Sequence, residues 1–77
     1  MITVRLFAAA AEAADAQELT LDVGTVIGLR EALAARGDEA PRVIGQCAIL
    51  REGTRLEDAA ALASGDLVDV LPPFAGG

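Results

Sequence analysis

Segments near both ends of the 77-residue chain alternate apolar and polar residues, as strands do when one face of a sheet is buried. At residues 2–7 this alternation predicts a strand in which Phe7 lies on the face opposite the alternating apolar residues. At residues 67–71 it predicts a strand in which Leu67 and Leu71 share one face. The fold therefore has strands at both ends of the chain.

The middle of the chain contains one pattern typical of a helix, which begins after Thr25. The Thr25 hydroxyl suits an N-cap because it can accept a hydrogen bond from a free amide of the first turn. Apolar residues then recur at the spacing of a buried helical stripe, at Val26, Leu29 and Leu33. Gly37 is expected to end this helix, and residues 38–41 are expected to form a loop because Pro41 disfavours helical angles in the residue before it.

Shorter patterns predict the remaining elements. Further strands are expected at residues 18–23, 46–50 and 54–56. Residues 8–17 are rich in alanine but too few to form a stable helix alone, so they are expected to connect two strands with about one helical turn. Residues 57–63 are expected to form a helical turn or an irregular crossover. Strands and one helix in this order predict a single α+β domain.

Charge and composition exclude several classes of function. The chain has six basic residues, all arginine, no histidine and 12 acidic residues, which gives a net charge of -6. This balance argues against nucleic acid and against an anionic membrane surface as partners. Without histidine, imidazole cannot serve as a general acid or base, and one cysteine cannot build a Cys/His zinc site, so no metal site is expected. Cys47 is expected to be a small buried residue, with a reactive thiol as the alternative.

The first residues and the hydropathy of the chain predict its location. Met1–Arg5 lacks a basic leader followed by an apolar run, which argues against a signal peptide. No window approaches the roughly 18 apolar residues that a membrane span needs. A single cysteine cannot form an internal disulfide, which fits a reducing compartment. A cytoplasmic protein is therefore expected.

The end of the chain is the most informative segment. Two prolines terminate the last strand and stiffen the exit, an aromatic ring follows, and two glycines let the backbone approach reactive atoms of another protein closely. A frayed end without function is the alternative. The arrangement favours a tail that threads into a narrow site and follows a domain of residues 1–71. The tail consists of Pro72, Pro73, Phe74, Ala75, Gly76 and Gly77.

The whole chain resembles the molybdopterin synthase small subunit (MoaD-like), in the MoaD/ThiS family of ubiquitin-like sulfur carriers. The most specific part of the resemblance is the ending Pro-Pro-x-x-Gly-Gly at residues 72–77, preceded by Gly65-Asp66 before the last strand. Leu6-Phe7-Ala8 and Gly24-Thr25-Val26 also match. The resemblance implies a ubiquitin-like β-grasp fold, with a mixed sheet of four to five strands packed on one main helix. Its first and last strands would be parallel at the centre of the sheet.

The resemblance also implies a function. The Gly77 carboxylate would be adenylated with ATP by an E1-like enzyme (MoeB-like) and converted to a thiocarboxylate with a sulfur donor. The tail would enter the molybdopterin synthase large subunit (MoaE-like), and sulfur would pass to cyclic pyranopterin monophosphate in molybdenum cofactor biosynthesis. The chain would then be a sulfur-carrying subunit without catalytic side chains, and no cofactor would be bound to it.

A partner interface is predicted on the sheet face away from the helix. Phe7, Leu67 and Leu71 lie on that face by alternation, and Phe74 follows in the tail. An exposed apolar patch of this kind is typical of a protein interface. The alternative is that residues 8–17 cover Phe7.

Other functions remain open from the sequence. Phe74 and Leu50 stand where the family usually has valine and often has asparagine, which leaves room for a sulfur carrier in thiamine, cysteine or tRNA thiolation pathways. A ubiquitin-like modifier joined through Gly77 to lysines of target proteins is a further candidate. A β-grasp binding module whose tail has no function, and a thiol enzyme using Cys47, complete the alternatives.

Overall fold

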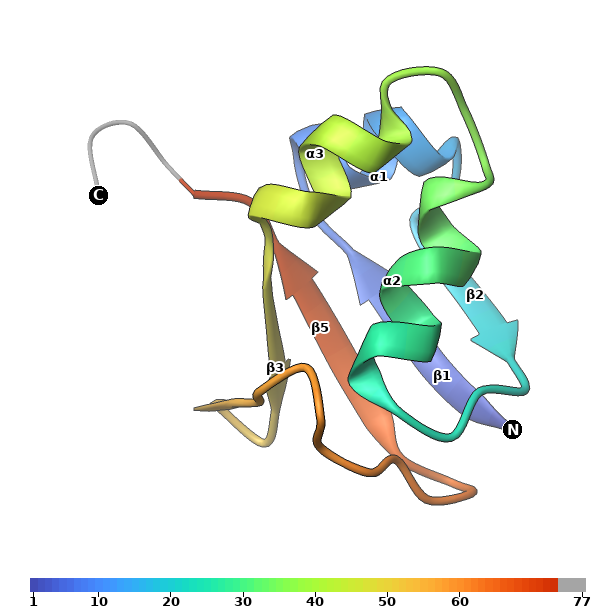
Figure 1. Ribbon diagram of the computed structural model, residues 1–77, viewed down its shortest axis with the longest axis vertical. Helices are drawn as coiled ribbons and strands as arrows, with labels where there is room; N and C mark the ends of the chain where they lie inside the picture. Colours follow the sequence, from blue (N-terminus) through green and yellow to red (C-terminus); the bar gives the residue numbers. More distant parts are fainter. Residues whose placement is uncertain (74–77) are drawn as a thin grey trace.

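The structure, a computed structural model, describes residues 1–73 of the chain. The strands are β1 (Ile2–Leu6), β2 (Glu18–Leu21), β3 (Ala48–Arg51), β4 (Thr54–Arg55) and β5 (Leu67–Leu71), and the helices are α1 (Ala9–Ala14), α2 (Val26–Ala34) and α3 (Ala40–Gln46). The five strands form one sheet in the order β2-β1-β5-β3-β4. The three helices pack over one face of this sheet and leave the other face open (Figure 1).

The two strands from the ends of the chain lie side by side at the centre of the sheet. Strands β1 and β5 are parallel, with Val4 opposite Val68, and both are flanked by antiparallel neighbours. A parallel pair needs a long crossover, and the helices and the β3–β4 hairpin supply it. This arrangement confirms the predicted mixed sheet of the β-grasp type with its first and last strands parallel.

The core lies between the sheet and the helices, where the alternating strand residues meet the helical stripe. Val4, Val68 and Val70 are fully buried, as the alternation predicts. The stripe of α2 is also fully buried, at Val26, Leu29 and Leu33. Each such side chain contributes roughly 1.5–3 kcal/mol on burial. The predicted core is confirmed.

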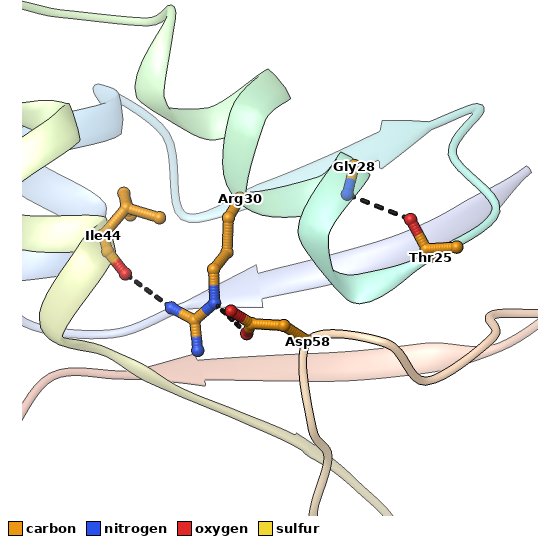
Figure 2. A network of polar contacts seen from close by, with 5 residues as sticks. All are labelled: Thr25, Gly28, Arg30, Ile44 and Asp58. Carbon is orange, nitrogen blue, oxygen red and sulfur yellow. Dashed lines mark hydrogen bonds and ion pairs between the residues drawn. The ribbon is translucent and has the colours of Figure 1, made fainter.

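The start of α2 follows the prediction and its end does not. The Thr25 hydroxyl accepts a hydrogen bond from the backbone N–H of Gly28 at 3.1 Å, which is the expected N-cap (Figure 2). Gly37 does not adopt the left-handed conformation of a terminating glycine, because α2 already ends at Ala34. Gly37 serves close packing instead, since a Cβ there would lie 2.8 Å from the Ala13 carbonyl oxygen.

Helix α3 was not predicted. The expected loop is confirmed for residues 38 and 39 but is wrong for residues 40 and 41, and the expected strand start at Gln46 is wrong. Pro41 lies in the first turn of α3, where its missing N–H removes no helical hydrogen bond. Ala40 and Ile44 are one turn apart and both are buried. Burial of this short apolar face stabilises a helix that the residues alone would not form, and β3 therefore begins only at Ala48.

Helix α1 is longer than the single turn expected for the segment between β1 and β2. It has six residues, and Ala10 and Ala14 are completely buried against the core. The Arg36 guanidinium donates to the carbonyl of Ala14 at 2.7 Å and satisfies one free acceptor at the end of α1. Tertiary contacts therefore supply the stability that an isolated helix of this length lacks.

Arg30 connects three elements on the helical side. Its Nη1 donates to the Ile44 carbonyl at 2.7 Å, and its Nε donates to Asp58 Oδ1 at 2.9 Å (Figure 2). One side chain of α2 thereby holds both α3 and the segment between β4 and β5. That segment is irregular, as expected for residues 57–63, and it pairs with Thr25 through a single bridge at Ala61.

Candidate functional site

The open face of the sheet carries the side chains that alternate away from the helices. Phe7 is 39% exposed and Leu67 is 43% exposed, whereas Leu71 is partly buried. Residues 8–17 therefore do not cover Phe7. The backbone N–H of Phe7 donates to the Val70 carbonyl at 3.2 Å, which continues the β1–β5 pairing beyond Leu6. This places Phe7 near Leu71, as the alternation predicts.

An ion pair divides the predicted apolar patch. Arg5 and Asp69 are opposite each other in the parallel β1–β5 register, and the guanidinium donates to both carboxylate oxygens at 2.7 and 3.1 Å. The hydrogen bond to Asp69, together with the charge of that carboxylate, raises the pKa of Arg5. Leu67 lies opposite Thr3, on the far side of this pair from Leu71. The structure therefore brings Phe7 and Leu71 together and separates Leu67 from them.

A groove of about 480 Å³ lies on the open face where β5 ends. Strands β3 and β5 form its floor, with Ala48 opposite Leu71 in the antiparallel register. The lining is mostly apolar, contributed by Ala48, Leu50, Leu71, Pro72 and Pro73. No pattern in the sequence indicated this groove, because the pairing of β3 with β5 joins residues far apart in the chain.

The base of the tail belongs to the folded domain. Pro72 is buried and Pro73 is exposed, so the chain emerges from the domain between these two residues. Strand β5 is hydrogen-bonded to β1 on one edge and to β3 on the other, which fixes the point of exit. The remaining predicted tail residues lie outside the described residues: Phe74, Ala75, Gly76 and Gly77.

A second charged pair fixes the loop that leads into β5. Arg51 Nη1 lies 2.8 Å from Asp66 Oδ2 and donates also to the Ala61 carbonyl at 3.1 Å. Asp66 accepts a further hydrogen bond from the backbone N–H of Ala63 at 2.9 Å. These hydrogen bonds, that of Ala63 first and that of Arg51 next, lower the pKa of Asp66. The pair is structural, since both side chains are occupied in holding the loop.

The thiol of Cys47 is enclosed by the protein. Cys47 is 1% exposed, lies between α3 and β3 instead of within the predicted strand, and its Sγ contacts the Val43 carbonyl at 3.2 Å. Burial raises the pKa of Cys47, which disfavours the thiolate, although the charge of Arg30 acts in the opposite direction. Cys47 is therefore the small buried residue that the sequence predicts.

Residues 1–73 lack the features of a metal site and of a membrane span. In this part of the chain no group of three or more His, Cys, Asp or Glu side chains is placed to hold a metal ion. None of its helices has the length and apolar character needed to cross a membrane.

The mixed sheet with parallel central strands, one helical face and a chain that exits from the end of β5 defines the ubiquitin-like β-grasp class of proteins. The chain belongs to the ThiS family, whose model matches residues 4–77.

Solved structures with this fold include two archaeal modifier proteins. SAMP1 from Haloferax volcanii is 31% identical, with a TM-score of 0.78 over 99% of this chain and 98% of that chain. SAMP1 from Methanosarcina acetivorans is 30% identical, with a TM-score of 0.81 over 99% of this chain and 95% of that chain. A further match is a chain in the solved complex of subunits 1 and 2 of molybdopterin-converting factor from Helicobacter pylori. It is 23% identical, with a TM-score of 0.69 over 99% of this chain and 97% of that chain, and it shares the fold. A comparison with curated proteins gives no match.

Proposed function

We propose that this protein is a sulfur carrier whose reactive group is the carboxylate of Gly77. Membership of the ThiS family supports this proposal. The observation that carries it is the exit of the chain at Pro73, directly after the central strand β5. Because β5 is paired on both edges, the domain provides a rigid base from which a partner can receive residues 74–77.

The chemistry follows from the reactivity of a carboxylate, which is a poor electrophile until it gains a good leaving group. A Gly77 carboxylate oxygen attacks the α-phosphorus of ATP on an E1-like adenylating enzyme, and pyrophosphate leaves. The terminal sulfur of a persulfide donor then attacks the acyl carbon, and AMP leaves. A thiol reductant cleaves the resulting acyl disulfide and releases the thiocarboxylate. This chain supplies only the carboxylate and the fold that presents it.

The proposed recipient is the large subunit of molybdopterin synthase. Fold similarity to a chain in the solved two-subunit complex from Helicobacter pylori and the Pro-Pro-x-x-Gly-Gly ending support this choice. The tail enters a cationic pocket of the large subunit, which supplies the lysine or histidine side chains that this sequence does not contain. The thiocarboxylate sulfur is then transferred to cyclic pyranopterin monophosphate.

The proposal is tested by incubating the protein with the E1-like enzyme of the same organism, ATP and a persulfide donor, followed by intact mass measurement. The expected product carries sulfur in place of one oxygen. A variant lacking Gly76 and Gly77 is the matched control and should not react. An unchanged mass for the wild-type chain would contradict the proposal.

A protein modifier is the second candidate function. The identities of 31% and 30% with two SAMP1 proteins favour it, because both structures are named as small archaeal modifiers. In this case the activated Gly77 carbonyl would form an amide with a lysine amine of a target, and AMP would leave. Digestion of cell extracts with chymotrypsin, which cuts after Phe74, and a search for Ala-Gly-Gly remnants of this tail on lysines would distinguish the two. Remnants on many proteins favour the modifier, whereas binding to the large subunit without remnants favours the carrier.

A further inference from the structure

Five of the six arginines have their guanidinium groups engaged within the domain. Three of them bind acidic side chains of other segments, one binds Glu39 at the N-cap of its own helix α3, and Arg36 binds a backbone carbonyl. The five are Arg5, Arg30, Arg36, Arg42 and Arg51. Arg55 is the exception: among residues 1–73 it makes neither a side-chain hydrogen bond nor an ion pair.

Arg55 lies at the rim of the groove beside the tail. It is exposed on the edge strand β4, opposite Leu50 of β3 in the antiparallel register. The same groove is lined by Leu71 and by the two prolines from which the tail emerges. Leu50 in turn lies opposite Asp69, whose charge is already paired with Arg5. Within residues 1–73, the Arg55 guanidinium therefore gives this end of the open face a positive charge that no acidic side chain pairs, in a chain of net charge -6.

We propose that the Arg55 groove binds an acidic side chain, next to an apolar one, on the E1-like enzyme that takes up the tail to activate Gly77. This inference rests on the proposed function. Pro72 and Pro73 both line the groove, and at most about 14 Å of extended chain separates Pro73 from Gly77, so a protein that holds Gly77 in its own site is brought close to this groove. The position of the tail in the fold therefore determines where the partner lies, and the groove residues determine which partner side chains can bind there.

The residues of the groove determine which acidic and which apolar side chain of the partner can bind. A carboxylate from the partner pairs with the planar guanidinium of Arg55, which can donate two parallel hydrogen bonds to it. An apolar side chain beside that carboxylate fills the space between Leu50 and Leu71, where it is removed from water. A partner with a lysine or arginine at this position is disfavoured by like charge.

The test uses the activation reaction with the E1-like enzyme of the same organism, ATP and a persulfide donor. The R55E variant is expected to raise KM by about tenfold with kcat nearly unchanged, since exposed interface charges act mainly on association. The rise should shrink at about 0.5 M salt because the charges are screened. R55K, which keeps the charge, should recover most of the lost affinity.

R42E is the matched control, because Arg42 of α3 pairs with Glu39 at the start of that helix, on the helical side of the sheet. Its KM should stay near that of the wild-type chain, and circular dichroism checks that each variant is folded. If R55E misfolds, R55Q replaces it. Equal KM values for R55E and R42E, with normal conversion of the wild-type chain, would overturn the inference alone. No conversion of the wild-type chain would overturn the proposed function and this inference with it.

Discussion

Replacement of Arg30 by methionine tests how the helical layer is held together. Methionine keeps much of the aliphatic packing of arginine but removes the hydrogen bonds to the Ile44 carbonyl and to Asp58 (Figure 2). The bond to the carbonyl is charge-assisted and the arginine side chain is only 17% exposed, so its loss costs about 1.5–3 kcal/mol. The Asp58 side chain is 59% exposed, so its ion pair contributes at most about 1 kcal/mol.

The expected total is about 2–4 kcal/mol, which corresponds to a fall in melting temperature of roughly 8–32 °C for a domain of this size. Thermal unfolding of R30M followed by circular dichroism measures it. The control is D58N, which removes the ion pair alone and should lower stability by less than about 1 kcal/mol. A loss in D58N equal to that in R30M, or no loss in R30M, would refute the assigned role of the Ile44 contact.

Four further substitutions test other contacts. G37A should destabilise the domain by about 1–3 kcal/mol, since its Cβ would meet the Ala13 carbonyl oxygen, whereas G45A on the exposed side of α3 should stabilise it by about 0.5–1 kcal/mol. The pKa of Asp66 is lower in the folded protein than in the unfolded chain. Its contribution to the free energy of unfolding is therefore complete above the unfolded pKa of about 3.9 and is lost as pH falls through the lower folded pKa. D66N should flatten this pH dependence. C47S should leave sulfur transfer unchanged, and native Cys47 should react slowly with iodoacetamide.

Denaturant unfolding measures the first two effects, at pH 7 for the glycine variants and between about pH 2 and 5 for D66N. Equal stabilities of G37A and G45A would contradict the close approach assigned to Gly37. A wild-type curve as flat as that of D66N would remove the assigned role of Asp66. For Cys47, a large loss of sulfur transfer in C47S would support the thiol-enzyme alternative.

Local patterns in the sequence were sufficient for the elements that bury a regular face. Strand β5 has the predicted bounds, and α2 begins at its predicted cap, because each combines a clear periodicity with a recognisable boundary residue. Helix α3 lacks both. Its first turn contains Pro41, which also occurs in loops, and its buried face is only Ala40 and Ile44. The contacts that stabilise it come from α1 and α2, so no local signal indicated it.

The candidate site also has parts that the sequence predicted and parts that it could not predict. Alternation placed Phe7 and Leu71 on the open face, but it could not show that the Arg5–Asp69 pair separates Leu67 from them, since that pair depends on the β1–β5 register. The groove at Arg55 likewise depends on the pairing of β3 with both β4 and β5. Residue type and spacing were sufficient to identify the tail, whereas the residues that surround its base could be identified only from the strand pairing.

The most direct test of the central claim is to locate the sulfur after activation. The wild-type chain is treated with the E1-like enzyme, ATP and a persulfide donor, and fragment mass spectrometry then assigns the added sulfur to a residue. The proposed carrier function predicts a thiocarboxylate at Gly77, with Cys47 unmodified. Sulfur found on Cys47 as a persulfide, with an unchanged Gly77 carboxylate, would contradict it.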